Sequence, residues 1–364
     1  MSENPEMTRG GIPRIRAQIN GMPVNSVIHA EVTASASGRS GRFTLTFGVS
    51  DGVPEQDWPN RMMGVVEVAI FMRDKLSESE ARIFDGLANH VTYDPIRKIA
   101  YMRGHDHSSV LAGSVIEESF VNNTASEIAG QIARRHGFGA DITMTTALIG
   151  SYRGGIHSQI LLNSYARFTN EWALLMYLAK SENFELFVEG KTLVFRPSLK
   201  FRYGNTPLRL QDLSSIRFTK RCPLSRKTSV VVKSWNSWLN HASSHEERQS
   251  SDSEDNGYMT GTDGDSGEFV LIRPNLSFVD AENLAQKYLA ALNERKFTVD
   301  IVMPGEVSLR PGALITVTGG DTDFNREYMV SSLRRCFSPT RGFLQYLRGT
   351  AVSENTSDAL SLVI

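Results

Sequence analysis

Apolar and polar residues alternate along much of the first hundred positions, and a period of two is typical of half-buried strands. In the run 42–49 the apolar residues share one face: Phe43, Leu45, Phe47 and Val49. Runs of the same kind occur at 15–19, 24–32, 65–72, 81–89 and 98–105. Turn signals such as Asn20-Gly21 separate these runs, which predicts a small antiparallel barrel or sandwich. We assign this first β-barrel domain to residues 12–116, behind a flexible N-terminus at 1–11.

After residue 122 the spacing of apolar residues becomes that of helices. Thr124 and Glu127 form a capping box, and Gly137 is placed to end the helix that follows. The apolar stripe of this helix is Ile128, Ala129, Ile132 and Ala133. A second helix, 169–182, carries Trp172, Leu175, Met176 and Ala179 on one face. It leads into a hairpin, 184–188 with 192–196, and we assign residues 117–204 to a helix-hairpin insert domain.

The remaining chain returns to strand patterns. These runs lie at 215–219, 228–234, 298–303, 313–318, 328–333 and 342–350, with one helix at 280–294. Residues 241–267 are polar, acidic and glycine-rich, which predicts a mobile loop. We assign 205–352 to a second β-rich domain and 353–364 to a C-terminal tail. The fold class is therefore β-rich α+β, with a helix-bearing insert between two β-rich parts.

Length and charge restrict the possible functions. A chain of 364 residues exceeds what a single core of roughly 250–300 residues fills, so several subdomains are expected. Lys plus Arg (39) nearly equals Asp plus Glu (40), so the composition gives no support to non-specific nucleic-acid binding. The sequence shows no signal peptide and no run of ~18 apolar residues, and we expect no membrane segment. Cys222 and Cys336 are the only cysteines, which suits a reducing compartment, so the default expectation is a cytoplasmic protein.

His105-Asp106-His107 is the main candidate for a metal site. Residues one and three of a strand face the same side, so the two imidazoles could bind one ion. A third ligand would have to come from a distant histidine, either His90 or His29. The tripeptide also fits turn residues that end a strand, and the spacing leaves both interpretations open.

The acidic loop suggests calcium but lacks the pattern that calcium loops need. Its carboxylates are Asp252, Glu254, Asp255, Asp263 and Asp265. They miss the alternate ligand positions, central glycine and terminal glutamate of an EF-hand loop, so a solvated loop is expected.

Other patterns also lack the spacing of known catalytic motifs. The glycine pairs, Gly10-Gly11, Gly154-Gly155 and Gly319-Gly320, precede no Lys-Ser/Thr and are interpreted as turns. The adjacent carboxylates, Glu117-Glu118 and Glu246-Glu247, would point to opposite faces of a strand. We therefore assign no catalytic, cofactor-binding or metal-binding residue, and we expect no cofactor and no enzymatic activity.

Basic and aromatic residues leave two interpretations open. The C-terminal arginines, Arg326, Arg334, Arg335, Arg341 and Arg348, could meet a nucleic acid, or form a solvated face or the rim of a subunit interface. The side chains of Trp235 and Trp238 could anchor a protein interface or pack in the core.

Several short motifs occur in a defined order along the chain. The most specific are SFVNNTASEIA at 119–129 and IARRHGF at 132–138. The others are the strand end YMRGHDHS at 101–108, the hairpin at 184–197, LRPGALI at 309–315 and YMVSS at 328–332. In this order the motifs resemble the late control D family of phage tail proteins. The family pattern does not account for the loop 241–267 or the tail beyond Ser353.

This resemblance implies a structural baseplate hub of a contractile phage or phage-like tail. It implies that 12–116 and 205–352 are two small antiparallel β-barrel (tube-type) domains with helix-containing inserted domains. It also implies a homotrimer whose paired barrels form a ring of pseudo-sixfold symmetry, related to the N-terminal part of type VI secretion spike proteins. Its expected partners are the central spike, the tail tube or tube-initiator protein, other baseplate (wedge) proteins and the tape measure protein, with DNA only as passing cargo. The expected location is the virion tail baseplate, assembled in the host bacterial cytoplasm.

Two other classes of function stay open at this point. One is a tail-associated, metal-dependent cell-wall hydrolase that uses His105 and His107 with a distant carboxylate. The other is a carbohydrate- or receptor-binding module, for which the candidate aromatic pairs are Trp235/Trp238 and Phe324/Tyr328.

Overall fold

A computed structural model describes most of the strands and helices of the chain. The described residues are 14–24, 26–36, 38–49, 64–73, 80–146, 148–149, 151–152, 160–163, 168–182, 184–197, 205–220, 227–233, 257–260, 266–272, 281–282, 284–285, 288, 297–318 and 324–352. The chain divides into two compact units. The first unit is Met1–Ile216 with Asp300–Asn325 and Met329–Gly349, and the second is Arg217–Val299 with Arg326–Tyr328 and Thr350–Ile364.

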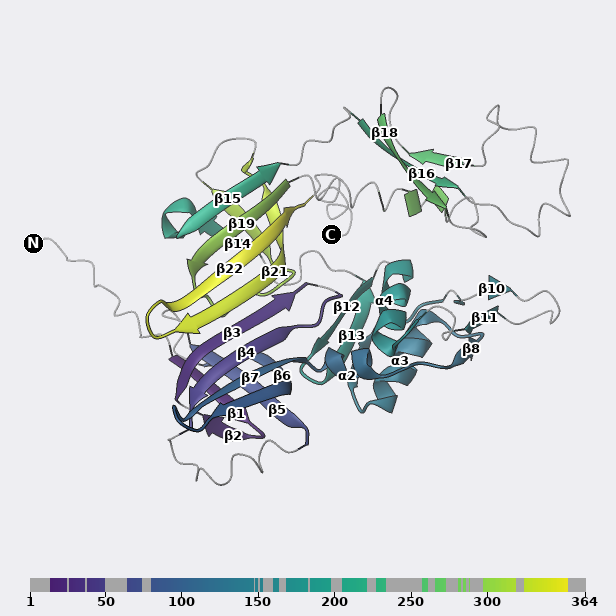
Figure 1. Cartoon of the computed structure of the whole chain (residues 1–364). Coiled ribbons are helices and arrows are strands. Elements are labelled where there is room, and N and C mark those ends of the chain that lie inside the picture. The colour runs from purple at the N-terminus through teal and green to yellow at the C-terminus, as the bar shows by residue number, and fades with distance from the viewer. Residues whose placement is uncertain are drawn as a thin grey trace, which may run out of the picture. The chain divides into compact units, whose positions relative to one another are not determined.

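Most strands belong to one large sheet (Figure 1). The first strand set is β1 Arg14–Ile19, β2 Met22–Val24, β3 Val27–Ser35, β4 Arg42–Gly48, β5 Val66–Arg73, β6 Ala81–Asp94 and β7 Ile99–Asp106. The second strand set is β14 Asn205–Arg209, β15 Ser215–Lys220, β19 Phe297–Pro304, β20 Leu314–Thr318, β21 Glu327–Ser338 and β22 Gly342–Ala351, with a 3₁₀ turn at Leu210–Asp212. The order is β15-β19-β22-β21-β3-β4-β7-β6-β5-β1-β2, while β20 pairs with β21 and β14 pairs with β20.

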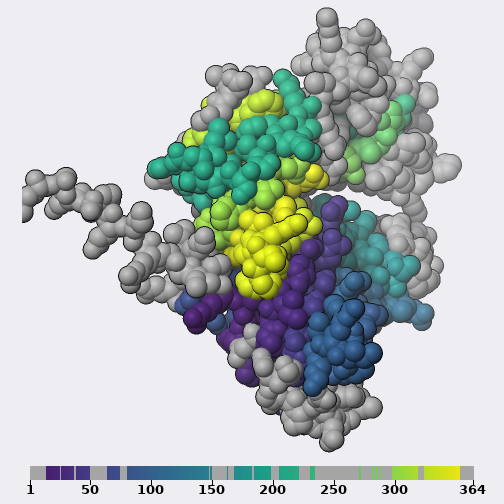
Figure 2. All heavy atoms as spheres, turned by 60° about the vertical axis from the view of Figure 1, so that its left-hand side comes forward, coloured from purple at the N-terminus to yellow at the C-terminus, as the bar shows by residue number. Residues whose placement is uncertain are grey.

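The pairing of β3 with β21 joins the two strand sets, and we call it the seam. Its register runs antiparallel from Ser332 opposite Ser35 to Phe337 opposite Ala30. Figure 2 shows the C-terminal strands lying directly along the N-terminal strands on one face. The two predicted barrels are therefore connected by hydrogen bonds of one sheet, while the predicted domain boundaries stay a prediction.

The seven strands of the first strand set pack around a single hydrophobic core. Buried side chains from all seven strands form one cluster, which includes Ala17 of β1, Val24 of β2, Val32 of β3 and Met102 of β7. Along β4 the predicted alternation is confirmed, since Phe43, Leu45 and Phe47 are all buried.

The insert has its own core. Its elements are α2 Ser108–Gly113, β8 Ser119–Val121, α3 Ala125–Arg135, β9 Gly139–Ile142, β10 Ser151–Tyr152, β11 Ile160–Asn163, α4 Glu171–Glu182, β12 Phe184–Glu189 and β13 Thr192–Pro197. The capping box of α3 is confirmed, and Gly137 follows that helix with a φ of +67°. The predicted stripe of α3 is buried against Leu174 and Leu178 of α4. None of the helices in the described part has the length and apolar content needed to cross a bilayer.

In the second unit three strands form a separate small sheet. They are β16 Lys227–Lys233, β17 Gly257–Thr260 and β18 Ser266–Ile272, with β16 in the middle. Val230 and Val232 pack against Ala281 and Ala285 of the predicted third helix. The predicted loop 241–267 contains strand residues, because the backbones of 257–260 and 266–267 pair with β16. Residues 241–256 and 261–265 lie outside the described part.

The β-rich α+β fold class is confirmed, but several elements were not predicted. They are the short strands β2, β8–β11 and β14, the helix α2, and strands β17 and β18. Parallel pairings also occur, between β9 and β13, between β14 and β20 and between β16 and β18.

Gly104 provides a test of the packing in the first strand set. A Cβ on Gly104 would lie 1.9 Å from the backbone oxygen of Leu87 on β6, a contact that the sheet cannot relax without moving a strand. We expect Gly104→Ala to lower the free energy of unfolding by about 3 kcal/mol, measured by urea denaturation. The control is Gly113→Ala, where a Cβ meets nothing within 4 Å, and this variant should stay within about 0.5 kcal/mol of the parent protein. Equal stability of the two variants would contradict this packing.

Candidate functional site

At one end of the first strand set, the two middle strands stop short of their neighbours. β4 begins at Arg42 and β7 ends at Asp106. β3 with the residue after it, and β6 on the other side, extend past these ends by residues 34–36 and 81–85. The sheet therefore has a notch where two strands are missing.

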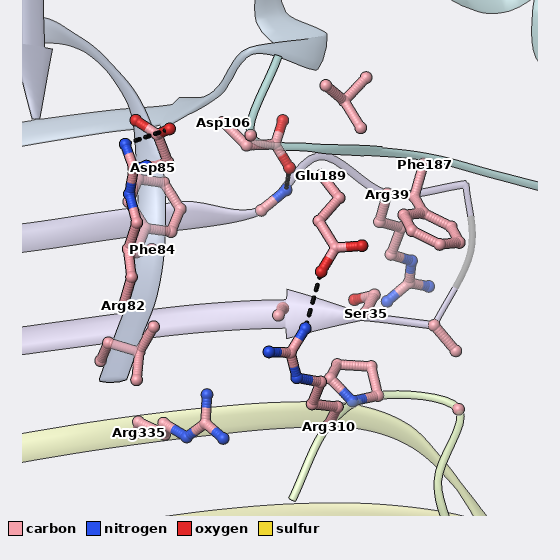
Figure 3. A pocket seen from close by; sticks show the side chains of 18 of the residues that line it. Ser35, Arg39, Arg82, Phe84, Asp85, Asp106, Phe187, Glu189, Arg310 and Arg335 are labelled. Carbon is pink, nitrogen blue, oxygen red and sulfur yellow. Dashed lines mark hydrogen bonds and ion pairs between the residues drawn. The ribbon is translucent and has the colours of Figure 1, made fainter. Parts of the chain in front are cut away.

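A cavity of about 530 Å³, which we call the notch cavity, lies at this place. It is lined by the two overhangs, by the β12–β13 hairpin and by the loop 307–312. Figure 3 shows Phe84 and Phe187 among its side chains, together with several arginines and carboxylates. The first strand set, the insert and the second strand set all contribute to this one site.

Asp106 forms the floor of the notch cavity. Its carboxylate accepts hydrogen bonds from the Gly41 amide at 2.5 Å, the Ser40 hydroxyl at 2.8 Å and the Ser108 amide at 3.0 Å. The Ser108 hydroxyl donates to the same carboxylate. Asp106 thus connects the loop before β4 to the first turn of α2. Both of its carboxylate oxygens accept hydrogen bonds, which is a structural role.

Asp85 lies on the wall of the cavity between Arg82 and His107. Arg82 Nη2 is 2.5 Å from Asp85 Oδ2, and Nε2 of the buried His107 is 3.6 Å from Oδ1, within ion-pair range but beyond a hydrogen bond. Partial burial raises the pKa of Asp85, but His107 and Arg82 outweigh it and the pKa lies below its usual value. Asp85 is therefore a carboxylate at neutral pH.

The tip of the β12–β13 hairpin contacts both strand sets. Glu189 binds Arg310 at 2.7 Å, and Lys191 binds Glu67 of β5 at 2.7 Å. Both ion pairs are about half exposed, so each contributes on the order of 0–1 kcal/mol. The hairpin is thus held at the site by weak charge pairs rather than by a large apolar contact at its tip.

The structure does not bring the histidines together as a metal site. Nδ1 of His105 is 3.3 Å from the amide nitrogen of Asn89, whereas His107 faces Asp85. Nε2 of His90 is 3.2 Å from the Thr92 hydroxyl. Among the described residues, no three histidine, cysteine, aspartate or glutamate side chains lie close enough to hold a metal ion.

Of the five C-terminal arginines, one is buried and three others have side-chain partners. Arg335 is buried on the seam, where Nη2 donates to the backbone oxygens of Val307, at 3.1 Å, and Leu309. Arg348 pairs with Asp300 at 2.7 Å, and the guanidinium of Arg334 lies 4.2 Å from the centre of the Tyr346 ring. Arg326 lies 4.3 Å from the ring centre of Phe297, and the amide of Arg341 donates to the Ser338 hydroxyl. This geometry supports structural roles.

The ARRHG motif surrounds a buried carboxylate in the insert. Glu171, the first residue of α4, is 1% exposed, so its charge must be paired where it lies. Arg135 reaches it at 2.6 Å and His136 at 2.5 Å. Arg135 also binds Glu118 at 2.6 Å, and these partners raise the pKa of its guanidinium. The motif therefore fixes the end of α3 to the start of α4.

The Trp235/Trp238 pair, the five acidic residues proposed for calcium, the glycine pairs and Glu246-Glu247 lie outside the described residues. Tyr328 is fully buried, so it cannot be a solvent-facing platform for a sugar.

Sequence reasoning missed three residues, namely Asp85, Arg39 and Glu171. Of these, Asp85 and Arg39 line the notch cavity. Asp85 stands beside the buried Phe84 within an apolar run, and Glu171 opens a helix that is otherwise apolar on its inner face. A charged residue in such a position signals a partner, but the partner cannot be identified from one sequence.

Substitutions in the tripeptide His105-Asp106-His107 can test whether it has a structural role or binds a metal. We expect Asp106→Ala to lower the free energy of unfolding by about 2 kcal/mol, because the buried donors at Gly41 and Ser108 lose their acceptor. His105→Ala, with one exposed hydrogen bond, should change it by less than about 0.5 kcal/mol. Thermal or urea unfolding of both variants, with and without added zinc, is the measurement. A zinc-dependent loss of stability in His105→Ala would support a metal site instead.

The thiol of Cys336 gives a test based on pH. Burial and the neighbouring Glu31, whose carboxylate is 3.6 Å away, raise the pKa of Cys336 to about 11. Only a small fraction is thiolate at pH 8, so in a Cys222→Ser variant iodoacetamide should react on the order of 100-fold more slowly than in the urea-unfolded control. The rate should rise about tenfold per pH unit until the pKa is reached. Equal rates in folded and unfolded chains would show that the thiol is not shielded by the seam.

Comparisons with known proteins give likeness in structure alone. No protein-family profile and no curated protein matches this sequence. The structure resembles the 43 kDa tail protein of prophage MuSo2 from Shewanella oneidensis, with a TM-score of 0.63 and 14% identity, over 92% of this chain and 96% of that chain. It also resembles a tail protein from Neisseria meningitidis, with a TM-score of 0.65 and 12% identity, over 93% of this chain and 97% of that one.

A third similar structure comes from a secretion system. It is an Escherichia coli component of the type VI secretion system, described as similar to the bacteriophage T4 tail proteins gp27 and gp5; the TM-score is 0.58 at 12% identity, over 93% of this chain and 77% of that one. At such low identities the likeness establishes the fold and nothing more. The chain therefore has, over nearly its whole length, the fold of these phage tail and type VI secretion proteins.

Proposed function

We propose that this chain is a structural, non-enzymatic hub protein of a contractile phage or phage-like tail. The observation that carries the proposal is the extent of the likeness, which covers 92% of this chain and 96% of the Shewanella tail protein. Both strand sets and the insert therefore lie within the shared fold, as a common structural role requires.

The chemistry of the motif residues supports a structural role. Arg135 and His136 bind the buried Glu171 between two helices, and Asp106 binds backbone amides at the end of β7. The residues that resemble the late control D family are thus used to hold elements together, which is consistent with a protein that positions others.

In this proposal three copies form a closed ring. Each copy contributes two strand sets, so three copies present six similar units, which would join a threefold central spike to a sixfold tail tube. Cyclic symmetry limits the assembly to a defined size. The partners are the spike, the tube or its initiator protein, wedge proteins and the tape measure protein; DNA would be passing cargo, and the location would be the virion tail baseplate.

The proposal predicts a trimer and a specific assembly defect. Native mass spectrometry of the purified chain, alone and with its spike protein, should give a species of three times the mass of one chain. Electron microscopy of tails made without this chain should show no complete baseplate.

Complementation separates this role from a hydrolase. Tails should be restored by the parent chain and equally by His105→Ala, because assembly needs no metal-bound imidazole. A chain that stays monomeric with spike and tube proteins present, or tails that assemble without it, would refute the hub.

A further inference from the structure

The notch cavity exposes a strand edge that the sheet does not use. Residues 81–85 of β6 pair with β5 on one side, and the register with β7 begins only at Gly86. No strand among the described residues occupies their other side. Across the cavity lies β12, the outer strand of the sheet β12-β13-β9, whose Leu186 oxygen already accepts a hydrogen bond from the Gly38 amide at 2.9 Å. The open edge of β6 is therefore the template for an added strand.

The cavity has the size and lining of a peptide site. Its volume of about 530 Å³ lies within the range of ligand sites. Ile83 and Phe84 line it from β6, and Phe187 and Val188 line it from β12. Side chains at alternate positions of an added strand would meet these apolar groups, while its backbone would meet the strand edge.

The charged side chains that line the notch cavity indicate which charge a bound peptide would carry. The other charged side chains of the lining have partners: Arg82 with Asp85, Glu189 with Arg310, Glu185 with Arg196, Asp106 with amides and hydroxyls, and Arg335 with backbone oxygens. Arg39 is exposed and, within the described ranges, makes no hydrogen bond or ion pair. Figure 3 shows its side chain beside Phe187. A carboxylate is the natural partner of a free guanidinium.

We propose that the notch cavity binds an extended peptide segment of a partner protein, as a strand added along residues 81–85 of β6, with an acidic side chain of that segment on Arg39. The inference goes beyond the hub function and does not depend on it. It rests on the open edge of residues 81–85, the apolar lining of the notch cavity and the guanidinium of Arg39.

The test uses a displayed library of random twelve-residue peptides, selected on the intact chain. Retained peptides should alternate apolar residues and carry an aspartate or glutamate. Arg39→Glu should weaken their binding about tenfold or more, the effect of losing one charge-assisted hydrogen bond and adding repulsion. The matched control is Arg42→Glu, which makes the same charge change at an exposed residue outside the cavity lining and should leave binding unchanged.

A second arm tests the strand geometry. Synthetic copies of a retained peptide with N-methylated amides at alternate residues should lose binding in one of the two registers, because those amides would pair with the β6 edge. Failure to retain any peptide, equal binding to the Arg39→Glu and parent chains, or equal binding of both methylated registers would overturn the proposal. None of these results depends on whether the chain forms trimers.

Discussion

The seam between β3 and β21 is the interaction on which the rest of the first unit depends. It pairs residues 30–35 with 332–337, so the two ends of the described chain are held by one antiparallel ladder. Arg335 extends this contact, since its guanidinium binds the backbone of the loop 307–312 that closes the notch cavity. The seam therefore holds β21 and the loop 307–312 beside the first strand set, at the wall of the notch cavity.

Local elements could be predicted because their signals are local. The alternation in 42–49, the capping box at Thr124 and Glu127, and the glycine after α3 each act within a few residues. The resemblance to tail proteins rested on short motifs in order, and the structural likeness extends over nearly the same length. Asp106 shows how a motif residue can have a structural role without catalysis, since its carboxylate accepts hydrogen bonds from two backbone amides.

The site could not be predicted because it is built from distant segments. Parallel pairings such as β9 with β13 join strands that no turn connects, so one sequence holds no sign of them. Arg335 was grouped with surface arginines, although it stands two residues after the buried Leu333 and so shares its face of β21. The notch arises where β4 and β7 end, and strand ends are the least certain part of a pattern.

The seam also has a consequence for biosynthesis. β3 leaves the ribosome early, whereas its partner β21 follows only after about 300 further residues, which takes some 15–60 s at bacterial elongation rates. During that interval the outer edge of β3 lacks its native neighbour and is open to mispairing with other nascent chains. Slow translation or premature termination between the two strands would therefore favour aggregation over native subunits.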